Sequence, residues 1–187
     1  MDRLLADIKA RTPIPEDLEA DIRSLFRKEE IKKNDVLLTE GRTCRKLYYL
    51  DTGIIRTYYY HDDKEITSWF YKEGFFVTSW YSFLTLEPSF EYIKATEDSI
   101  LYSIDHKHYV NLQEKHPAFE RFCRILSEEQ VAFIDYYGKG YMFLSAKERY
   151  VRLLEYFPDI ELRVKLGDIA THLGISQETL SRIRSSS

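Results

Sequence analysis

Seven short runs of β-branched and aromatic residues between Ile31 and Asp105 constrain the fold of this chain more than any other feature. Turn residues such as Glu40-Gly41 and Thr52-Gly53 separate them. Short strands spaced in this way are typical of an antiparallel roll, jelly roll or barrel. The predicted strands cover residues 36–38, 47–50, 54–60, 65–71, 75–77, 93–95 and 100–104.

Helical spacing of apolar residues flanks this β region on both sides. Before it, Leu18, Ile22 and Phe26 predict one amphipathic helix within residues 16–28. After Asp105 the helical pattern returns, first to about residue 114 and then in a long segment that begins near Pro117, where proline suits the first turn. The chain is therefore predicted to be α+β.

The long helical segment carries an apolar stripe. Phe119, Leu126 and Phe133 repeat every seven residues, and Phe122 and Tyr136 lie on the adjacent line. Such a seam is typical of a helix that packs on its symmetry mate, so these five residues are the predicted dimer contacts. The same stripe would equally suit a helix that lies on the β domain.

The end of the long helix is marked by two glycines, Gly138 and Gly140. Each glycine costs a helix interior about 1 kcal/mol relative to alanine, so we expect a hinge here. Ser145 and Glu148 then match a capping box, which predicts a new helix that stops before Pro158.

Residues 166–184 form the most specific stretch of the sequence. Ala170 and Gly174 are small where two helices would cross closely, and Gly174 can adopt the left-handed conformation of a tight turn. Ser176 is a good N-cap for the second helix. This pattern is typical of a helix-turn-helix, and the alternative is an αα-hairpin with no nucleic-acid role. The apolar positions that would form its core are Ile169, Leu173, Ile175, Leu180 and Ile183.

Polar side chains should project from the first turns of the second helix, the part of a recognition helix that reaches base edges. Arg182 can donate two hydrogen bonds to guanine, and Glu178 can accept one from cytosine. Alternatively, Glu178 only stabilises the N-terminus of its helix. The predicted DNA-binding residues are Ser176, Gln177, Glu178, Thr179, Ser181 and Arg182.

The order of these parts resembles the Crp/Fnr family of transcription regulators over nearly the whole chain. Glu178, Ser181 and Arg182 look like the Glu-x-x-Ser-Arg recognition pattern of the Fnr branch. The resemblance implies a homodimer that binds two-fold-related sites on double-stranded DNA. It also implies a cyclic-nucleotide-binding-like β-roll sensor at residues 1–115, a dimerisation helix at 116–143, and a helix-turn-helix domain without a β-wing at 144–187.

The resemblance extends to the sensor half, in Gly41 and in residues 47–53 and 74–77. Cyclic-AMP receptors place a glutamate and an arginine near the positions of Ser79 and Ser89, and neither serine supplies that charge. We therefore expect a small-molecule effector other than cyclic AMP and leave any cofactor unidentified. The expected effector pocket comprises Phe76, Thr78, Ser79, Trp80 and Ser89; the aromatic residues around it would line the pocket or simply pack the roll.

Competing functions have weaker support. No hydrolase elbow, Walker loop or dinucleotide fingerprint is present, so no catalytic residues and no enzyme activity are predicted. His106 and His108 are the one close histidine pair, and they lack the following carboxylate of a cupin-like site, so no metal is expected. A sensor or interaction protein that has lost DNA binding remains open.

Charge and apolar content limit the partners. The net charge is −4, and residues from Ser145 onward carry 7 basic against 6 acidic side chains, so DNA binding must come from a motif rather than from bulk charge. No apolar run could span a membrane, and the N-terminus does not match a secretory signal. We expect a cytoplasmic protein in which Cys44 and Cys123 are ordinary buried thiols.

Overall fold

The computed structural model describes residues 1–185, apart from the side chains of residues 139 and 142. Its helices are α1 (Asp2–Arg11), α2 (Glu16–Leu25), α3 (Trp80–Thr85), α4 (His106–Lys115), α5 (Pro117–Phe143), α6 (Ala146–Tyr156), α7 (Ile160–Arg163), α8 (Leu166–His172) and α9 (Gln177–Ser185). Its strands are β1 (Arg27–Ile31), β2 (Val36–Leu38), β3 (Lys46–Thr52), β4 (Ile55–His61), β5 (Lys64–Tyr71), β6 (Phe76–Val77), β7 (Tyr92–Ala95) and β8 (Ser99–Asp105).

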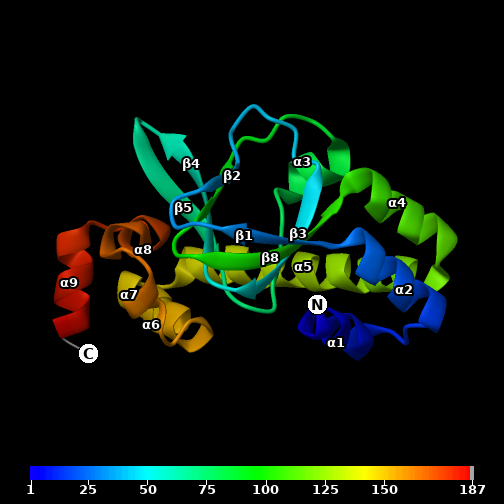
Figure 1. Cartoon of the computed structure of the whole chain (residues 1–187). Coiled ribbons are helices and arrows are strands. Elements are labelled where there is room, and N and C mark those ends of the chain that lie inside the picture. Colours follow the sequence, from blue (N-terminus) through cyan, green and yellow to red (C-terminus); the bar gives the residue numbers. More distant parts are fainter. Residues whose placement is uncertain (186–187) are drawn as a thin grey trace.

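The strands form two antiparallel sheets, ordered β1-β8-β3-β6 and β2-β7-β4-β5 (Figure 1). The β4–β5 hairpin is regular from the Ile55–Tyr71 pair to the His61–Lys64 pair, apart from one bulge near Thr57. Every predicted strand is present, so the prediction of an antiparallel β-roll in an α+β chain is confirmed.

Gly53 makes the turn between β3 and β4. Its φ is +107°, and a Cβ added there would lie 2.1 Å from Oγ of Ser99. Only glycine fits this conformation and this close approach.

Helix α5 runs along the roll and carries the chain to the C-terminal helices (Figure 1). It continues as a helix through Gly138 and Gly140 and ends at Phe143, so the glycines do not interrupt its backbone, and the hinge stays a prediction; the side chain of residue 139 lies outside the described part. Aromatic contacts on both sides explain this, because Tyr137 packs on Trp69 and Tyr141 packs on His172.

The capping box after α5 is formed as predicted. The backbone N–H of Ser145 donates to Glu148 Oε2 at 2.7 Å, and the N–H of Glu148 donates to Ser145 Oγ at 3.3 Å. Helix α6 then ends at Tyr156, before Pro158.

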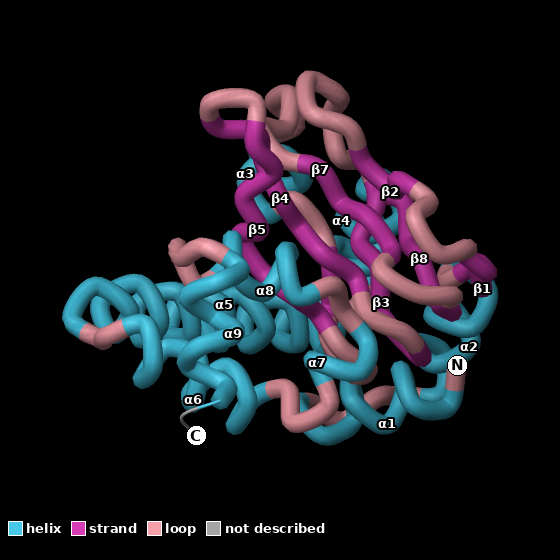
Figure 2. The backbone as a smooth tube through the Cα atoms, turned by 90° about the vertical axis from the view of Figure 1, so that its left-hand side faces the viewer, coloured by secondary structure: helices cyan, strands magenta, loops and turns pink. Residues whose placement is uncertain are grey.

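Two clusters of buried apolar side chains organise the molecule. The first joins the β-roll to α1, α2, α4 and the first half of α5. The second lies among α6–α9 and also includes Ile54 and Phe70 of the roll. Helix α8 lies against β5, as Figure 2 shows, so the C-terminal helices share a core with the β-roll.

Four elements were not predicted: α1, β1, α3 and α7. Strand β1 (Arg27–Ile31) is rich in charge because it pairs only with β8 at the edge of its sheet. Helix α2 also ends earlier than predicted, at Leu25, because the backbone is already extended at Phe26.

Candidate nucleic-acid interface and sensor cavity

Helices α8 and α9 form the helix pair expected within residues 166–184. Gly174 adopts φ +67° in the turn, and the N–H of Ile175 donates to the carbonyl of Ala170 at 3.0 Å. Ile169 and Leu180 are fully buried between the helices. The turn and core therefore use the residues that the sequence indicated.

Ser176 caps α9. Its Oγ accepts a hydrogen bond from the backbone N–H of Thr179 at 3.2 Å, and the two side-chain hydroxyls lie 3.0 Å apart. Thr179 is half-buried, and both its backbone N–H and its side-chain hydroxyl contact Ser176 in the cap. The cap fixes where the helix begins and which side chains its first turns present.

The outer face of α9 is exposed. It presents the four predicted side chains Gln177, Glu178, Ser181 and Arg182. Among residues 1–185, Glu178 and Arg182 have no ion-pair partner, whereas Arg184 pairs with Glu161 at 2.5 Å. The polar groups of the first two turns are therefore free to meet another molecule.

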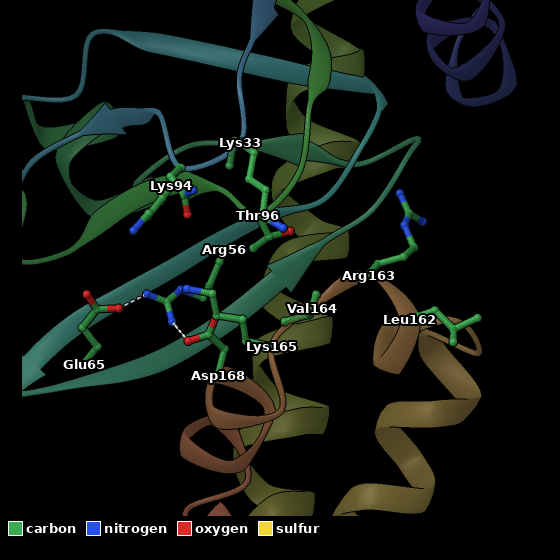
Figure 3. Close-up of a pocket in the computed structure, with 12 residues that line it drawn as sticks. Lys33, Arg56, Glu65, Lys94, Thr96, Leu162, Arg163, Val164, Lys165 and Asp168 are labelled. Atoms are coloured by element: carbon green, nitrogen blue, oxygen red, sulfur yellow. Dashed lines mark hydrogen bonds and ion pairs between the residues drawn. The ribbon is translucent and has the colours of Figure 1, made fainter.

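Helix α8, in contrast, is bound to the β-roll. The guanidinium of Arg56 on β4 forms ion pairs with Asp168 on α8 and with Glu65 on β5 (Figure 3). Arg56 is only 2% exposed. One helical turn after Asp168, the Oγ1 of Thr171 accepts from the backbone N–H of Thr67 at 3.3 Å. These interdomain contacts were not visible in the sequence, because no local pattern pairs Arg56 with Asp168.

A second ionic contact joins α7 to the roll. Arg163 Nη2 lies 2.5 Å from Glu73 Oε1 and also pairs with Glu97, and these two carboxylates raise the pKa of Arg163. Lys72 of the roll donates to the carbonyl of Tyr156 at 2.5 Å. The C-terminal helices are thus attached to the roll at several points.

Burial shifts the pKa of two groups in this contact. His172 lies against Trp69 and Phe70, and burial lowers its pKa to about 4. Burial also raises the pKa of Asp168, an effect that Arg56 offsets only in part. The contact therefore favours a neutral imidazole.

The expected effector pocket is only partly assembled. Thr78, Ser79 and Ser89 are buried and bonded within the roll, with Ser89 Oγ donating to Ser79 Oγ at 3.1 Å and Thr78 Oγ1 lying 3.2 Å from Cys44 Sγ. These three residues do not line the cavity described below, so their place in an effector pocket stays a prediction.

Phe76 and Trp80 do reach a cavity, which has a volume of about 760 Å³ and lies between the roll and α5–α6. Its walls are mainly aromatic and also include Trp69, Phe133 and Tyr137. Sequence analysis predicted the wall residues Phe76 and Trp80 of the roll. It did not predict the wall residues of α5, because their position depends on how α5 packs against the roll.

The predicted dimer contacts divide into two groups. Phe119, Phe122 and Leu126 are buried in this chain's own core, so they are not available to a second copy and the prediction is wrong for them. Phe133 is half-buried against Trp69, and Tyr136 is 59% exposed. The apolar stripe packs on the roll because this contact removes the apolar face of the sheet from water.

Histidine and cysteine side chains are the remaining candidates for metal or thiol chemistry. The described residues contain no group of three histidine, cysteine or acidic side chains that could hold a metal ion. His106 begins α4, as predicted, and packs on Phe83. Cys44 and Cys123 are buried free thiols, as expected. Within the described chain, no helix is long and apolar enough to cross a membrane.

Comparison with known proteins agrees with this architecture. The cyclic nucleotide-binding domain model matches residues 28–116. A comparison with curated proteins found no match.

Several solved structures are similar over most of the chain. A double mutant of CooA from Carboxydothermus hydrogenoformans is 19% identical, with a TM-score of 0.68 over 96% of this chain and 82% of that chain. FixK2 from Bradyrhizobium japonicum is 19% identical, with a TM-score of 0.71 over 87% and 84% of the two chains. A protein from Eubacterium rectale described as a transcriptional regulator of the Crp/Fnr family is 20% identical, with a TM-score of 0.71 over 92% and 83%. Residues 28–116 are therefore similar to a cyclic nucleotide-binding domain, and the chain has the overall fold of Crp/Fnr-type regulators.

Proposed function

We propose that this protein is a sequence-specific transcription regulator in which α8 and α9 are a helix-turn-helix and α9 enters the major groove of double-stranded DNA. The observation that carries this proposal is the outer face of α9. Its polar side chains are exposed and its charged ones are unpaired within residues 1–185, whereas Leu180 on the other face is buried.

The chemistry of the face suits base recognition. Arg182 can donate two hydrogen bonds to O6 and N7 of guanine, and Glu178 can accept one from N4 of cytosine. Gln177 and Ser181 can add contacts to bases or phosphates. The net charge of −4 implies that non-specific affinity is modest and that recognition depends on these few contacts.

We propose that the protein acts as a homodimer through α5. Phe119, Phe122 and Leu126 of α5 pack on the roll, so a second copy would bind the side chains on the opposite, exposed face of this helix. Val131, Ile134, Tyr136 and Phe143 are exposed there, with Phe143 88% exposed. Exposed apolar residues on a long helix mark an interaction surface. The division proposed for the chain is a sensor at 1–115, a dimerisation helix at 116–143 and a DNA-binding domain at 144–187.

The sensor is proposed to bind a small molecule other than cyclic AMP. Ser79 and Ser89 offer no charge to a ribose or a cyclic phosphate, and both are buried in a closed hydrogen-bonded cluster. A signal can reorient the C-terminal helices only to the extent that it binds one arrangement better than another.

Selection of bound duplexes from a random DNA pool at physiological salt tests the proposed function. We expect enrichment of a two-fold palindrome with half-sites about one helical turn apart. A variant in which Gln177, Glu178 and Arg182 are all alanine is the control, and it should enrich nothing. If the unaltered protein enriches no sequence, with or without cell extract that supplies small molecules, the DNA-binding proposal fails.

A further inference from the structure

A polar hollow of about 230 Å³ lies where the β-roll meets the segment that leads into α8 (Figure 3). It shares no wall residue with the aromatic cavity beside α5. Basic side chains outnumber acidic ones in its wall, so the question is which of these charges are already paired. The charged wall residues are Lys33, Arg56, Lys94, Arg163 and Lys165, with Glu65 and Asp168.

The two arginines of the hollow are paired, but its lysines are not. Glu65 and Asp168 both form ion pairs with Arg56. Arg163 pairs with carboxylates outside the wall. The ammonium groups of the three lysines form no ion pair with any residue of the described chain. The hollow therefore gathers three positive charges that lack a direct counter-ion.

The sheet places one of these lysines directly beside another cation. Lys94 of β7 and Arg56 of β4 are partners in the antiparallel register, so their side chains share one face of the sheet. Like charges in such a position destabilise a sheet. Lys94 is half-buried, and Glu65 and Asp168 attract it only from a distance, because both are bonded to Arg56. An anion beside Lys94 would offset the repulsion.

We propose that this hollow binds a compact anion with two or more negative charges, of the size of phosphate or pyrophosphate, between Lys33 and Lys94 on one side and Lys165 on the other. Figure 3 shows Lys94 and Lys165 on opposite sides of Arg56. Lysine binds phosphate groups as a point charge and needs no fixed geometry. The volume is smaller than that of sites for drug-sized ligands, which favours a compact occupant.

The bound anion would join two parts of the molecule. Lys33 lies in the turn before β2 and Lys94 lies in β7, so both belong to the roll, whereas Lys165 directly precedes α8. An anion that contacts both sides would add to the ion pair between Arg56 and Asp168. Because a ligand stabilises the state that it binds, it would strengthen the attachment of α8 to the roll.

Titration calorimetry of the full chain with pyrophosphate, without DNA, tests the proposal. The ionic strength is held constant with chloride, since salt alone screens exposed charges. We expect saturation at one anion per chain with a Kd of about 1 mM or lower. Inorganic phosphate should bind about three- to tenfold more weakly, because it carries fewer charges. Pyrophosphate should also raise the urea midpoint of the protein.

Three variants locate the binding. Changing Lys94→Gln and Lys165→Gln together should weaken pyrophosphate binding by about tenfold or more, because two charge-assisted hydrogen bonds are lost. Changing Lys94→Arg and Lys165→Arg together keeps both charges and should bind within about threefold of the unaltered protein. Lys107→Gln is the control, because Lys107 is an exposed lysine of α4 outside the hollow, and its affinity should stay within about twofold.

Three outcomes would overturn the proposal. The hollow is not an anion site if pyrophosphate does not saturate up to about 10 mM at constant ionic strength. The lysines are not its ligands if the double glutamine variant binds as tightly as Lys107→Gln. If pyrophosphate does not bind but the double glutamine variant loses affinity for the selected DNA, the lysines contact the DNA backbone instead. The calorimetry contains no DNA, so failure of this inference and failure of the proposed function are distinguishable.

Discussion

The two helices of the C-terminal pair use their polar side chains in opposite ways. Asp168, Thr171 and His172 of α8 all contact the β-roll. Gln177, Glu178 and Arg182 of α9 are exposed. The pair is thus anchored through its first helix, so the residues proposed to read DNA take no part in holding the domain. Substitutions in the two helices should therefore have separable effects.

The largest effect is expected from Arg56→Met. It leaves Asp168 and Glu65 without their buried cation, and breaking a buried ion pair from one side costs about 3–5 kcal/mol in free energy of unfolding. Urea denaturation measures this. Lys165→Met is the matched control, because Lys165 is exposed and has no ion pair within the described chain. If both variants unfold alike, α8 is not the anchor.

The next effect is a pH dependence that originates in His172. Its pKa is about 4 in the folded state and about 6.5 when unfolded, so between these values the unfolded chain binds the additional proton. Stability is therefore full above pH 6.5 and falls as the pH drops toward 4, by roughly 1–3 kcal/mol from this group. Comparing urea midpoints of the unaltered protein and His172→Asn from pH 7 to 4 isolates this contribution. If the urea midpoints of the two proteins change with pH in the same way, His172 is not the source of the pH dependence.

On the free face, Arg182→Ala should leave the free energy of unfolding within about 0.5 kcal/mol of the unaltered value. Its binding to the selected DNA should weaken by roughly 1–3 kcal/mol, with loss of preference at one base pair. Fluorescence anisotropy with the selected duplex and its single-base variants measures the DNA affinity and the base preference. Arg184→Ala is the control, since Arg184 is paired with Glu161. Equal weakening on every duplex would make Arg182 a phosphate contact instead.

The smallest effect is expected from Ser176→Ala. Loss of the cap at the start of α9 should lower stability by about 1 kcal/mol, and Ser176→Asp should largely restore it, since aspartate caps equally well. Thermal unfolding of the two variants measures the loss and the recovery of stability. A neutral Ser176→Ala would mean that packing of Leu180, rather than the cap, decides where α9 begins.

Local patterns predicted the strands, the capping box and the outer face of α9, because each depends on residues close together in the sequence. The apolar stripe of α5 shows where local patterns fail to predict a contact. Phe119, Phe122 and Leu126 have a spacing that suits either a second copy or the roll, and only the position of α5 decides between them. Strand β1 was missed for a related reason, since an edge strand needs no apolar alternation.

The sequence by itself determined the architecture of the chain and the side chains that α9 presents, since helical and strand periodicity and capping are local properties. The tertiary structure decided which surfaces are free. It buried Ser79 and Ser89 as a hydrogen-bonded pair, formed the cavity beside Tyr137, and paired Arg56 with Asp168, which lies 112 positions later in the sequence. Such contacts depend on how the elements pack, and packing joins residues whose separation in the sequence carries no signal.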